Sequence, residues 1–433
     1  MVKTSLANPS AIKAAFGLYA LSWKIAEPLL RLNPRLARGY QQRTLEHTPA
    51  FPADIWIQAA SAGEAYLAWE ILNNLSLPHP INIFLTSNTG QGLKILQKAV
   101  EHFKNKKIEI FASCAFFPFD RPSLMQKAVK LVNPRLLILL ESEIWPGLLA
   151  AMRRHHSKIL IINGRMTARS YKRYMLWPSF WKALKPDKIL AISKEDAFRF
   201  SSVFSSTQVQ IMPNIKFDRV DQAIGDTGGQ TSLKNPLRKY FQENQPLVVL
   251  GSIRKEEESD ILKIIDFLIK KQPDIIIGLF PRHMNRIKVW SQNLDHLSLP
   301  WQLRSALDQP AKKGSVIIWD IFGELSLAYG LANAVFVGGS LAPLGGQNFL
   351  EPLVCGVMPV IGESWYNFAW VGEKIMKQGL VRRASNWQAA AQFLLQDIKA
   401  PFSHKSVQAK TLEYLKNRQG GTAMACRVIS EML

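Results

Sequence analysis

Residues 54–75 read DIWIQAASAGEAYLAWEILNNL, a short apolar run followed by helix-forming sequence. The run 54–61 predicts a strand, and 65–75 predicts the helix after it. The same pair recurs as a strand over 81–87 and a helix over 90–104. Apolar runs without alternation are typical of strands that are buried on both faces, as in a parallel sheet covered by helices. The sequence therefore predicts an α/β fold.

This alternation of apolar runs and helices continues through two halves of the chain. The stretch GDTGGQTS at 225–232 contains three glycines and no core-forming residue, which predicts a linker. We expect two Rossmann-like domains, 46–220 and 221–433, that face a cleft with ligands at the carboxyl ends of strands. An alternative places the final helix back on the first domain. Strands are predicted at 136–142, 158–164, 188–193, 247–252, 275–281, 315–320 and 334–339, and further helices at 256–271 and 324–331.

Composition narrows the class of protein. Of 433 residues, 47% are apolar and 20% are charged, which indicates a packed globular protein. Lys and Arg outnumber Asp and Glu by 54 to 33, a net charge of +21 that suits nucleic acid, an anionic membrane or phosphorylated substrates. The three cysteines lie far apart, which argues against a disulfide scaffold and a cysteine zinc site and fits a reducing compartment. No P-loop, HExxH or GxSxG motif is present.

The N-terminal stretch AIKAAFGLYALSWKIAEPLLR, residues 11–31, allows two interpretations. Its uncharged run, 14–23, is too short to span a bilayer, which needs about 20 apolar residues. Aromatic and apolar residues bordered by cations suit a helix that lies among anionic lipid headgroups. The alternative is a first helix that packs onto the protein core.

The motif SAGE at Ser61–Glu64 follows the first strand. Ser61 and Glu64 have the spacing of a capping box, which satisfies free amides at a helix start. The functional alternative makes Glu64 a general base in a cleft, beside a glycine that permits close approach of a ligand. Because a helix N-terminus favours a negative charge, we expect Glu64 to be ionised.

The motif ESEIWP at residues 141–146 ends another strand. Alternation along a strand predicts that Glu141 and Glu143 point to opposite faces, so that only one enters the cleft. A structural alternative pairs one of them with Arg153 or Arg154. A carboxylate buried beside Trp145 would be unfavourable without a partner, which favours a functional role.

Two motifs in the second half suggest an anion site. PRH at 281–283 follows a strand and offers an arginine and a histidine, a pair suited to phosphate. The stretch AVFVGGSLAPLGGQNFLEPLVCG, 334–356, joins a strand to a helix through two glycine pairs. Such glycines can present backbone amides to an anion, and Glu351 can accept hydrogen bonds from ribose hydroxyls. The alternatives are a solvated loop and a glycine-rich turn with ordinary caps.

Taken in order, these motifs resemble the lipid A Kdo transferases, the 3-deoxy-D-manno-octulosonic acid transferases of Gram-negative bacteria. The resemblance covers roughly residues 15–385. It is carried by SAGE (61–64), FFPFD (116–120), ESEIWP (141–146), NGRMTARSYKRY (163–174), NIKFD (214–218), PRH (281–283), DIFGEL (320–325) and FVGGSLAPLGGQNFLEP (336–352).

The resemblance implies a GT-B fold, an N-terminal membrane-associating helix within 1–45, and inverting transfer of Kdo from CMP-Kdo to the lipid A precursor lipid IVA during lipopolysaccharide biosynthesis. It implies no metal, no cofactor and no nucleic-acid partner. The location implied is the cytoplasmic side of the anionic inner membrane, with peripheral binding or a single N-terminal anchor. Glu64 would be the catalytic base, and Glu141 or Glu143 would stabilise the transition state with Lys216. The implied CMP pocket comprises Pro281, Arg282, His283, Phe322, Gly323, Glu324, Gly339, Ser340, Asn348, Phe349, Leu350 and Glu351.

Two positions depart from the family's pattern. Gln347 replaces the histidine of a GGHN motif, and Arg254 falls where the family has a Ser/Thr-His-Glu stretch. Gln347 can form hydrogen bonds but cannot carry a proton. These departures keep open a related GT-B transferase with another nucleotide sugar or lipid acceptor. The distant alternative is a nucleic-acid-binding protein. In such a protein the cations would cluster on one face with aromatic residues, whereas in this sequence they are dispersed, which argues against it.

Overall fold

The structure is a computed structural model that describes residues 9–46, 51–105, 110–205, 208–219, 235–242 and 245–433. The chain divides into two compact units, Met1–Arg219 with Gln419–Leu433, and Val220–Arg418. The division falls one residue from the boundary expected after residue 220, and the final helix belongs to the first unit, which is the alternative stated above. The linker predicted at 225–232 lies outside the described residues.

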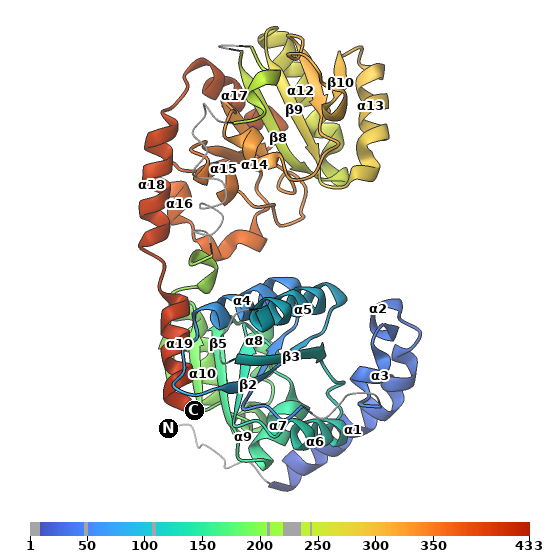
Figure 1. The fold of residues 1–433 in the computed structure, drawn as a ribbon, viewed down its shortest axis with the longest axis vertical. Coiled ribbons are helices and arrows are strands. Elements are labelled where there is room, and N and C mark those ends of the chain that lie inside the picture. The colour runs from blue at the N-terminus through green and yellow to red at the C-terminus, as the bar shows by residue number, and fades with distance from the viewer. Residues whose placement is uncertain (1–8, 47–50, 106–109, 206–207, 220–234, 243–244) are drawn as a thin grey trace. The chain divides into compact units, whose positions relative to one another are not determined.

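The first unit is built on a seven-stranded, wholly parallel sheet with the order β3-β2-β1-β4-β5-β6-β7 (Figure 1). The strands predicted at 81–87 and 158–164 are confirmed to the residue. The order reverses between β1 and β4, and such a switch point is where parallel sheets bind ligands. The strands are β1 (Ile55–Ala59), β2 (Ile81–Ser87), β3 (Ile110–Phe116), β4 (Leu136–Leu140), β5 (Lys158–Gly164), β6 (Lys188–Ala191) and β7 (Val209–Ile211).

Helices cover both faces of this sheet. One core cluster lies under α4, α5 and α19, and the other lies under α1, α6, α7, α9 and α10. Burial on both faces explains why β1 and β4 are apolar along their whole length. The helical elements are α1 (Pro9–Leu30), α2 (Pro34–Ala37), α3 (Tyr40–Arg43), α4 (Ala62–Asn74), α5 (Gly90–Asn105), α6 (Pro122–Val132), α7 (Pro146–Arg154), α8 (Ala168–Tyr174), α9 (Pro178–Ala183), α10 (Lys194–Phe204), α19 (Gly421–Met432) and the 3-10 turn η1 (Ile215–Phe217).

The second unit repeats this plan with the strand order β10-β11-β9-β8-β12-β13-β14, again wholly parallel. Its switch point lies between β8 and β12. Two parallel Rossmann-like sheets are what the sequence predicted. The strands are β8 (Leu247–Ile253), β9 (Ile276–Pro281), β10 (Trp301–Leu303), β11 (Ser315–Ile318), β12 (Ala334–Val337), β13 (Pro359–Ile361) and β14 (Arg382–Arg383).

The helices of the second unit also lie on both sides of its sheet, and α12 and α17 pack together over one core cluster. The sequence did not predict β3, β7, β10, β13 or β14. Most of these are short or partly exposed strands without a continuous apolar run. The helices are α12 (Glu258–Lys271), α13 (Ile287–His296), α14 (Leu325–Tyr329), α15 (Leu350–Val354), α16 (Lys374–Lys377), α17 (Trp387–Lys399) and α18 (His404–Lys416); the 3-10 turns are η3 (Arg238–Tyr240), η4 (Lys255–Glu257), η5 (Met284–Arg286), η6 (Arg304–Ala306) and η7 (Tyr366–Val371).

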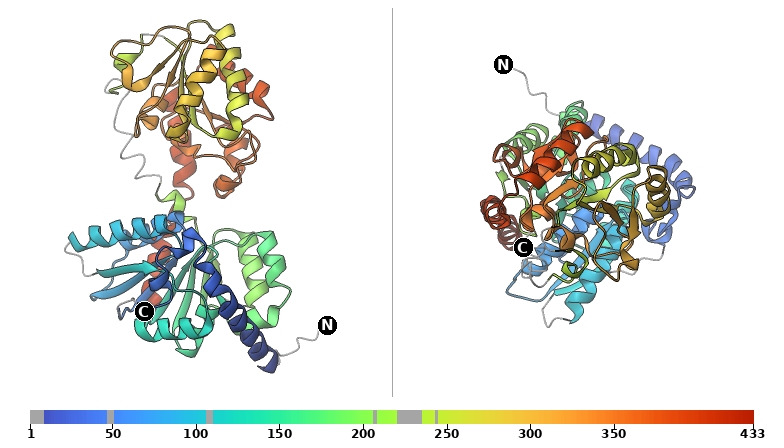
Figure 2. Two further views of the ribbon diagram at one scale, coloured as in Figure 1. Left: turned by 90° about the vertical axis from the view of Figure 1, so that its right-hand side faces the viewer. Right: turned by 90° about the horizontal axis from the view of Figure 1, so that it is seen from above.

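The N-terminal helix α1 has two apolar faces. Its inner face packs on the core, since Phe16 contacts Phe180 and Trp23 contacts Phe119 at ring-centroid distances of 5.2 and 5.9 Å. Figures 1 and 2 show α1 in dark blue against the helices on this side of the sheet. Packing of the first helix on the core is thereby confirmed, and its binding to a membrane stays a prediction. No helix within the described ranges is both long enough and apolar enough to cross a bilayer. The outer face exposes a row formed by Leu18, Leu21, Ile25 and Leu29.

Asp120, the last residue of the FFPFD motif, joins α1 to the start of α7. The carboxylate is 1% exposed and accepts hydrogen bonds from the backbone N–H groups of Gly147 and Leu148, both at 2.7 Å, and from the Tyr19 hydroxyl at 2.8 Å. Helix α7 has no side-chain cap of its own, because its N-cap residue is Trp145. Asp120 therefore caps a helix that is remote from it in sequence.

Replacement of Asp120 by Asn should lower the urea midpoint of the first unit. The amide would keep one acceptor oxygen and turn its NH2 group toward donors, leaving a buried N–H unpaired at a cost of about 1–3 kcal/mol. Urea unfolding followed by tryptophan fluorescence measures the effect. Asp266→Asn, which removes one member of a surface ion pair with Lys270, is the control. Equal midpoints for the two variants would contradict the capping role.

Candidate active site

The functional residues predicted in the first unit gather at the carboxyl ends of β1 and β4, its switch point. Glu64 lies in the first turn of α4, directly after β1, while Glu141 and Glu143 lie in the turn after β4. Both carboxylates of that turn act electrostatically on Glu64. The expectation that only one of them enters the site is wrong, because the strand ends at Leu140 and Glu141 has a positive φ of 55°, which breaks the alternation.

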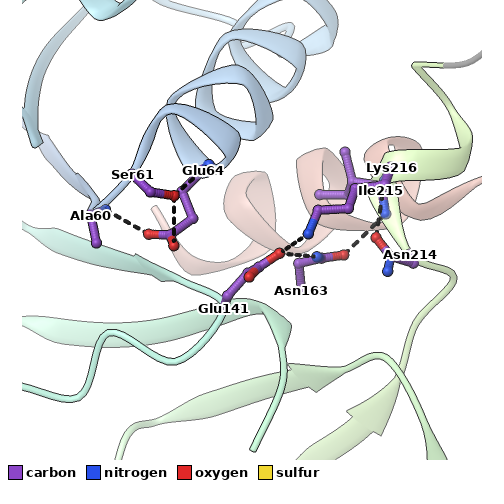
Figure 3. Close-up of polar contacts among 8 residues, drawn as sticks. All are labelled: Ala60, Ser61, Glu64, Glu141, Asn163, Asn214, Ile215 and Lys216. Carbon is purple, nitrogen blue, oxygen red and sulfur yellow. Dashed lines mark hydrogen bonds and ion pairs between the residues drawn. The ribbon is translucent and has the colours of Figure 1, made fainter. Parts of the chain in front are cut away.

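Ser61 caps α4 as the sequence predicted, but the capping box is incomplete, because the Glu64 side chain accepts from the N–H of Ala60 and not from that of the N-cap residue Ser61. The Ser61 hydroxyl accepts a hydrogen bond from the Glu64 backbone N–H and donates one to Oε1 of its carboxyl, at 3.5 and 3.2 Å. The N–H of Ala60 donates to Oε2 at 2.5 Å (Figure 3). The structural interpretation of this motif is therefore confirmed for the Ser61 cap. It does not exclude a catalytic role, because the same carboxyl lies among two others.

The protonation state of Glu64 differs from the one expected. Burial, followed by repulsion from Glu143 and then from Glu141, raises the pKa of Glu64 to about 8. The hydrogen bonds from Ala60 and Ser61 oppose this shift but are outweighed. The expectation that Glu64 is ionised at neutral pH is therefore wrong for the unliganded protein. A carboxylate with a raised pKa is a stronger base once it has lost its proton.

Glu141 is held by a cation and an amide. The Lys216 ammonium contacts Glu141 Oε1 at 2.5 Å, and the Asn163 side chain donates to the same oxygen at 3.5 Å. Figure 3 shows the Lys216 side chain reaching down from the η1 turn toward Glu141. Asn163 Oδ1 accepts from the Ile215 N–H, and Asn214 Oδ1 accepts from the Lys216 N–H, both at 3.0 Å, so the two asparagines position the turn that carries the lysine.

Glu143 accepts its hydrogen bonds from neutral side chains. Its Oε2 accepts hydrogen bonds from the Trp145 indole at 2.7 Å, from Gln58 at 3.2 Å and from Asn88 at 3.4 Å. Burial raises its pKa above the ordinary value. The partner that a carboxylate buried here needs is thus the Trp145 indole itself. The structural alternative with Arg153 is wrong, because Arg153 pairs with Asp187 at 3.0 Å.

Part of the predicted nucleotide pocket also comes together at the strand ends of the second unit. The Arg282 backbone N–H donates to the Ile253 carbonyl at 2.8 Å, and its side chain is exposed. Asn348 donates to Glu351 Oε1 at 2.9 Å. Burial raises the pKa of Glu351, and the hydrogen bond from Asn348 and the charge of Arg282 oppose this rise.

Other residues predicted for the pocket have structural surroundings. Phe349 and Leu350 are buried, and Phe349 packs against Phe368 with ring centroids 5.4 Å apart. Glu324 binds the buried Arg304 through both oxygens and accepts from the Trp319 indole at 2.8 Å. The side chains of Phe349, Leu350 and Glu324 therefore make packing contacts, hydrogen bonds or ion pairs within the second unit. Of the remaining predicted pocket residues, Pro281 is buried, whereas His283, Phe322 and Gly323 are exposed.

The glycine-rich loop after β12 does not present its first amides to an outside anion. The N–H groups of Gly339 and Ser340 donate to the carboxylate of Glu257, at 2.5 and 2.8 Å. The expectation that these two amides bind phosphate is therefore wrong for the unliganded structure. Glu257 was not predicted from the sequence, where it is one of three consecutive glutamates. Within the described residues, no group of three or more His, Cys, Asp or Glu could hold a metal ion.

Glu64→Gln should make the protein more stable toward alkaline pH. The folded-state pKa of about 8 exceeds the ordinary value of 4.5, so the folded state holds an extra proton between these values. The free energy of unfolding of the native protein therefore falls as pH rises through this window. Glutamine is neutral and can still accept from Ala60. The melting temperature of the variant minus that of the native protein should grow from pH 5 to pH 8, by about 2–4 °C for each kcal/mol. A constant difference would contradict the raised pKa.

Known proteins resemble this chain over most of its length. A sequence model described as "3-Deoxy-D-manno-octulosonic-acid transferase (kdotransferase)" matches residues 30–219, most of the first unit. The 3-deoxy-D-manno-octulosonic acid transferase of Haemophilus influenzae is 29% identical over 78% of this chain and 77% of its own length. That of Rickettsia felis is 32% identical over 69% of this chain, which spans only 61% of the relative's length.

A solved structure over most of the chain agrees with the fold. The crystal structure of UDP-GlcNAc 2-epimerase from Neisseria meningitidis, 14% identical, covers 87% of this chain and 98% of its own with a TM-score of 0.54. The C-terminal CMP-Kdo binding domain of WaaA from Acinetobacter baumannii is 27% identical over 43% of this chain and 96% of its own, with a TM-score of 0.39. The two parallel sheets, each with its own switch point, and the epimerase likeness confirm the predicted GT-B class of two Rossmann-like domains. Over most of its length the chain is similar to 3-deoxy-D-manno-octulosonic acid transferases.

Proposed function

We propose that the protein moves Kdo from CMP-Kdo to the lipid A precursor lipid IVA in lipopolysaccharide biosynthesis. Similarity to known 3-deoxy-D-manno-octulosonic acid transferases supports the reaction class. The observation that carries the proposal furthest is Glu64, a buried carboxyl of raised pKa at the switch point of a parallel sheet, beside the Glu141–Lys216 ion pair. Perturbed carboxyls in such a place are typical of general bases.

The reaction follows from these groups. Ionised Glu64 takes the proton from an acceptor hydroxyl as its oxygen attacks the anomeric carbon of Kdo. The bond from that carbon to the phosphate oxygen breaks on the opposite face, so the configuration inverts and CMP leaves as a stable anion. The proton remains on Glu64. No metal or cofactor is part of this proposal.

Cations would stabilise the charge that develops on the leaving phosphate. Arg282, whose side chain is exposed, and Lys216, which Glu141 holds in place, are the proposed residues. Asn348 and Glu351 would contact the nucleotide. The proposal no longer assigns the amides of Gly339 and Ser340 to the phosphate, since they already donate to Glu257.

The test incubates the purified protein with CMP-Kdo and tetra-acylated lipid A precursor and measures the mass of the lipid product. Native protein should add Kdo, and kcat/KM should rise about tenfold per pH unit up to about pH 8 and then level, since the base must be ionised. Glu64→Gln should lower kcat by about 10²–10⁴-fold and lose this pH dependence. Glu101→Gln, an exposed carboxyl on α5, is the matched control.

Two results would contradict the assignment. Undiminished turnover by Glu64→Gln would exclude Glu64 as the base. Failure of the native protein with CMP-Kdo, together with transfer from another nucleotide sugar, would favour the alternative GT-B transferase to which Gln347 and Arg254 point. The same assay thus separates the residue role from the identity of the donor.

We also propose that the protein binds the cytoplasmic surface of the inner membrane through α1. Leu18, Leu21, Ile25 and Leu29 follow one another by three or four residues and are 54–70% exposed on one face. Lys24 and Arg31, both exposed, border this row. Apolar side chains with adjacent cations suit the boundary between acyl chains and anionic headgroups.

Replacement of both Leu21 and Ile25 by Ser should reduce binding to anionic vesicles at least about tenfold, because two large apolar side chains no longer enter the lipid. Co-sedimentation with vesicles measures binding. These point changes are preferable to deletion of α1, since its inner face packs on the core. Leu297→Ser, an exposed apolar residue of the second unit, is the control. Equal co-sedimentation of native protein and double variant would exclude this face as the membrane contact.

A further inference from the structure

Glu257 is a buried carboxylate of the second unit that accepts four hydrogen bonds. The reaction proposed above does not use it. It lies in the η4 turn after β8 and is 2% exposed. Four backbone N–H groups donate to it: those of Ser340 and Leu341 at 2.8 Å to Oε1, and those of Gly339 at 2.5 Å and Arg254 at 3.3 Å to Oε2. Three of the donors are consecutive residues of the loop after β12.

The Glu257 carboxylate links the end of β8 to the end of β12, the two strands at the switch point. β8 and β12 are adjacent and parallel, and Glu257 follows the first while its donors follow the second. The ends of these strands approach closely, since a Cβ atom on Gly338 would lie 2.7 Å from the Ser252 carbonyl oxygen. Backbone amides this crowded and removed from water need an acceptor, and an ionised carboxylate is the strongest one available.

The loop that Glu257 holds carries the residues proposed to bind the nucleotide. Gly339 and Gly338 accept hydrogen bonds through their carbonyls from the N–H groups of Gly346 and Gln347, at 2.7 and 3.0 Å. The chain therefore folds back on the held segment just before it reaches Asn348 and Glu351. Displacement of the segment would move both side chains.

We propose that Glu257 is a positioning residue for the nucleotide donor: its buried carboxylate takes the place of an external anion on the amides of 339–341 and fixes the loop that ends in Asn348 and Glu351. The donor phosphate is then bound by side chains rather than by these three amides. The part of this inference that concerns the donor rests on the function proposed above. The part that concerns the loop does not.

Hydrogen exchange on the native chain tests the loop. The amides of 339–341 should already be protected without ligand, and addition of CMP should not protect them further. If they exchange as fast as free loop amides and become protected only with CMP, they form the phosphate site and the proposal is wrong. This measurement needs no variant.

Glu257→Gln tests the charge. Glutamine has nearly the same shape but one acceptor oxygen, so exchange at 339–341 should be about 10–100-fold faster. The dissociation constant for CMP, by calorimetry, and the KM for the donor should rise about tenfold or more, with the acceptor KM unchanged. Glu256→Gln is the matched control, because Glu256 is adjacent but exposed and pairs only loosely with Arg254, at 3.7 Å.

The outcomes separate the two proposals. Native affinity for CMP in Glu257→Gln, with native exchange at 339–341, would overturn the positioning role. Faster exchange in this variant, while the native protein itself binds no CMP, would support the role of Glu257 in the loop and contradict the proposed donor. An equal rise in the donor and acceptor KM values would indicate general loosening of the protein and would overturn the specific role.

Discussion

Burial of carboxyl groups at the switch points of two parallel sheets is the constraint on which the rest of this molecule depends. A parallel sheet covered on both faces leaves its strand ends as the place where polar side chains can gather. A carboxylate taken out of water there must either find donors or keep its proton. The first unit leaves Glu64 buried with only two donors and two negative neighbours, and the proton stays until about pH 8.

The three carboxyls of the first unit are not equivalent. Lys216 largely balances the charge of Glu141, whereas Glu143 is held by an indole and two amides that carry no charge. Glu143 contributes more than Glu141 to the raised pKa of Glu64. The site therefore combines a carboxylate in an ion pair, a carboxyl with neutral donors and a third, Glu64, whose pKa is raised to about 8.

The sequence predicted the architecture well because that architecture depends on local patterns. Continuous apolar runs predicted both sheets, and SAGE predicted the Ser61 cap at the start of α4. The properties that depend on distant chain segments were not predictable. The pKa of Glu64 follows from its burial and then from Glu143, nearly eighty residues away, and the capping of α7 follows from Asp120 rather than from its neighbour Trp145. Gln58, a polar residue inside an apolar strand, was the one local signal of the Glu143 site that remained unused.

A comparison of Glu64 with Glu257 explains why glycine-rich and acidic motifs alone do not identify function. Each follows the first strand of its unit and starts a helical turn, and each lies at a switch point. Four backbone amides donate to Glu257, which therefore has little capacity left to bind a ligand. Glu64 has one backbone donor and one hydroxyl. The number of donors that the fold brings to a carboxylate, rather than its sequence context, separates the structural residue from the reactive one.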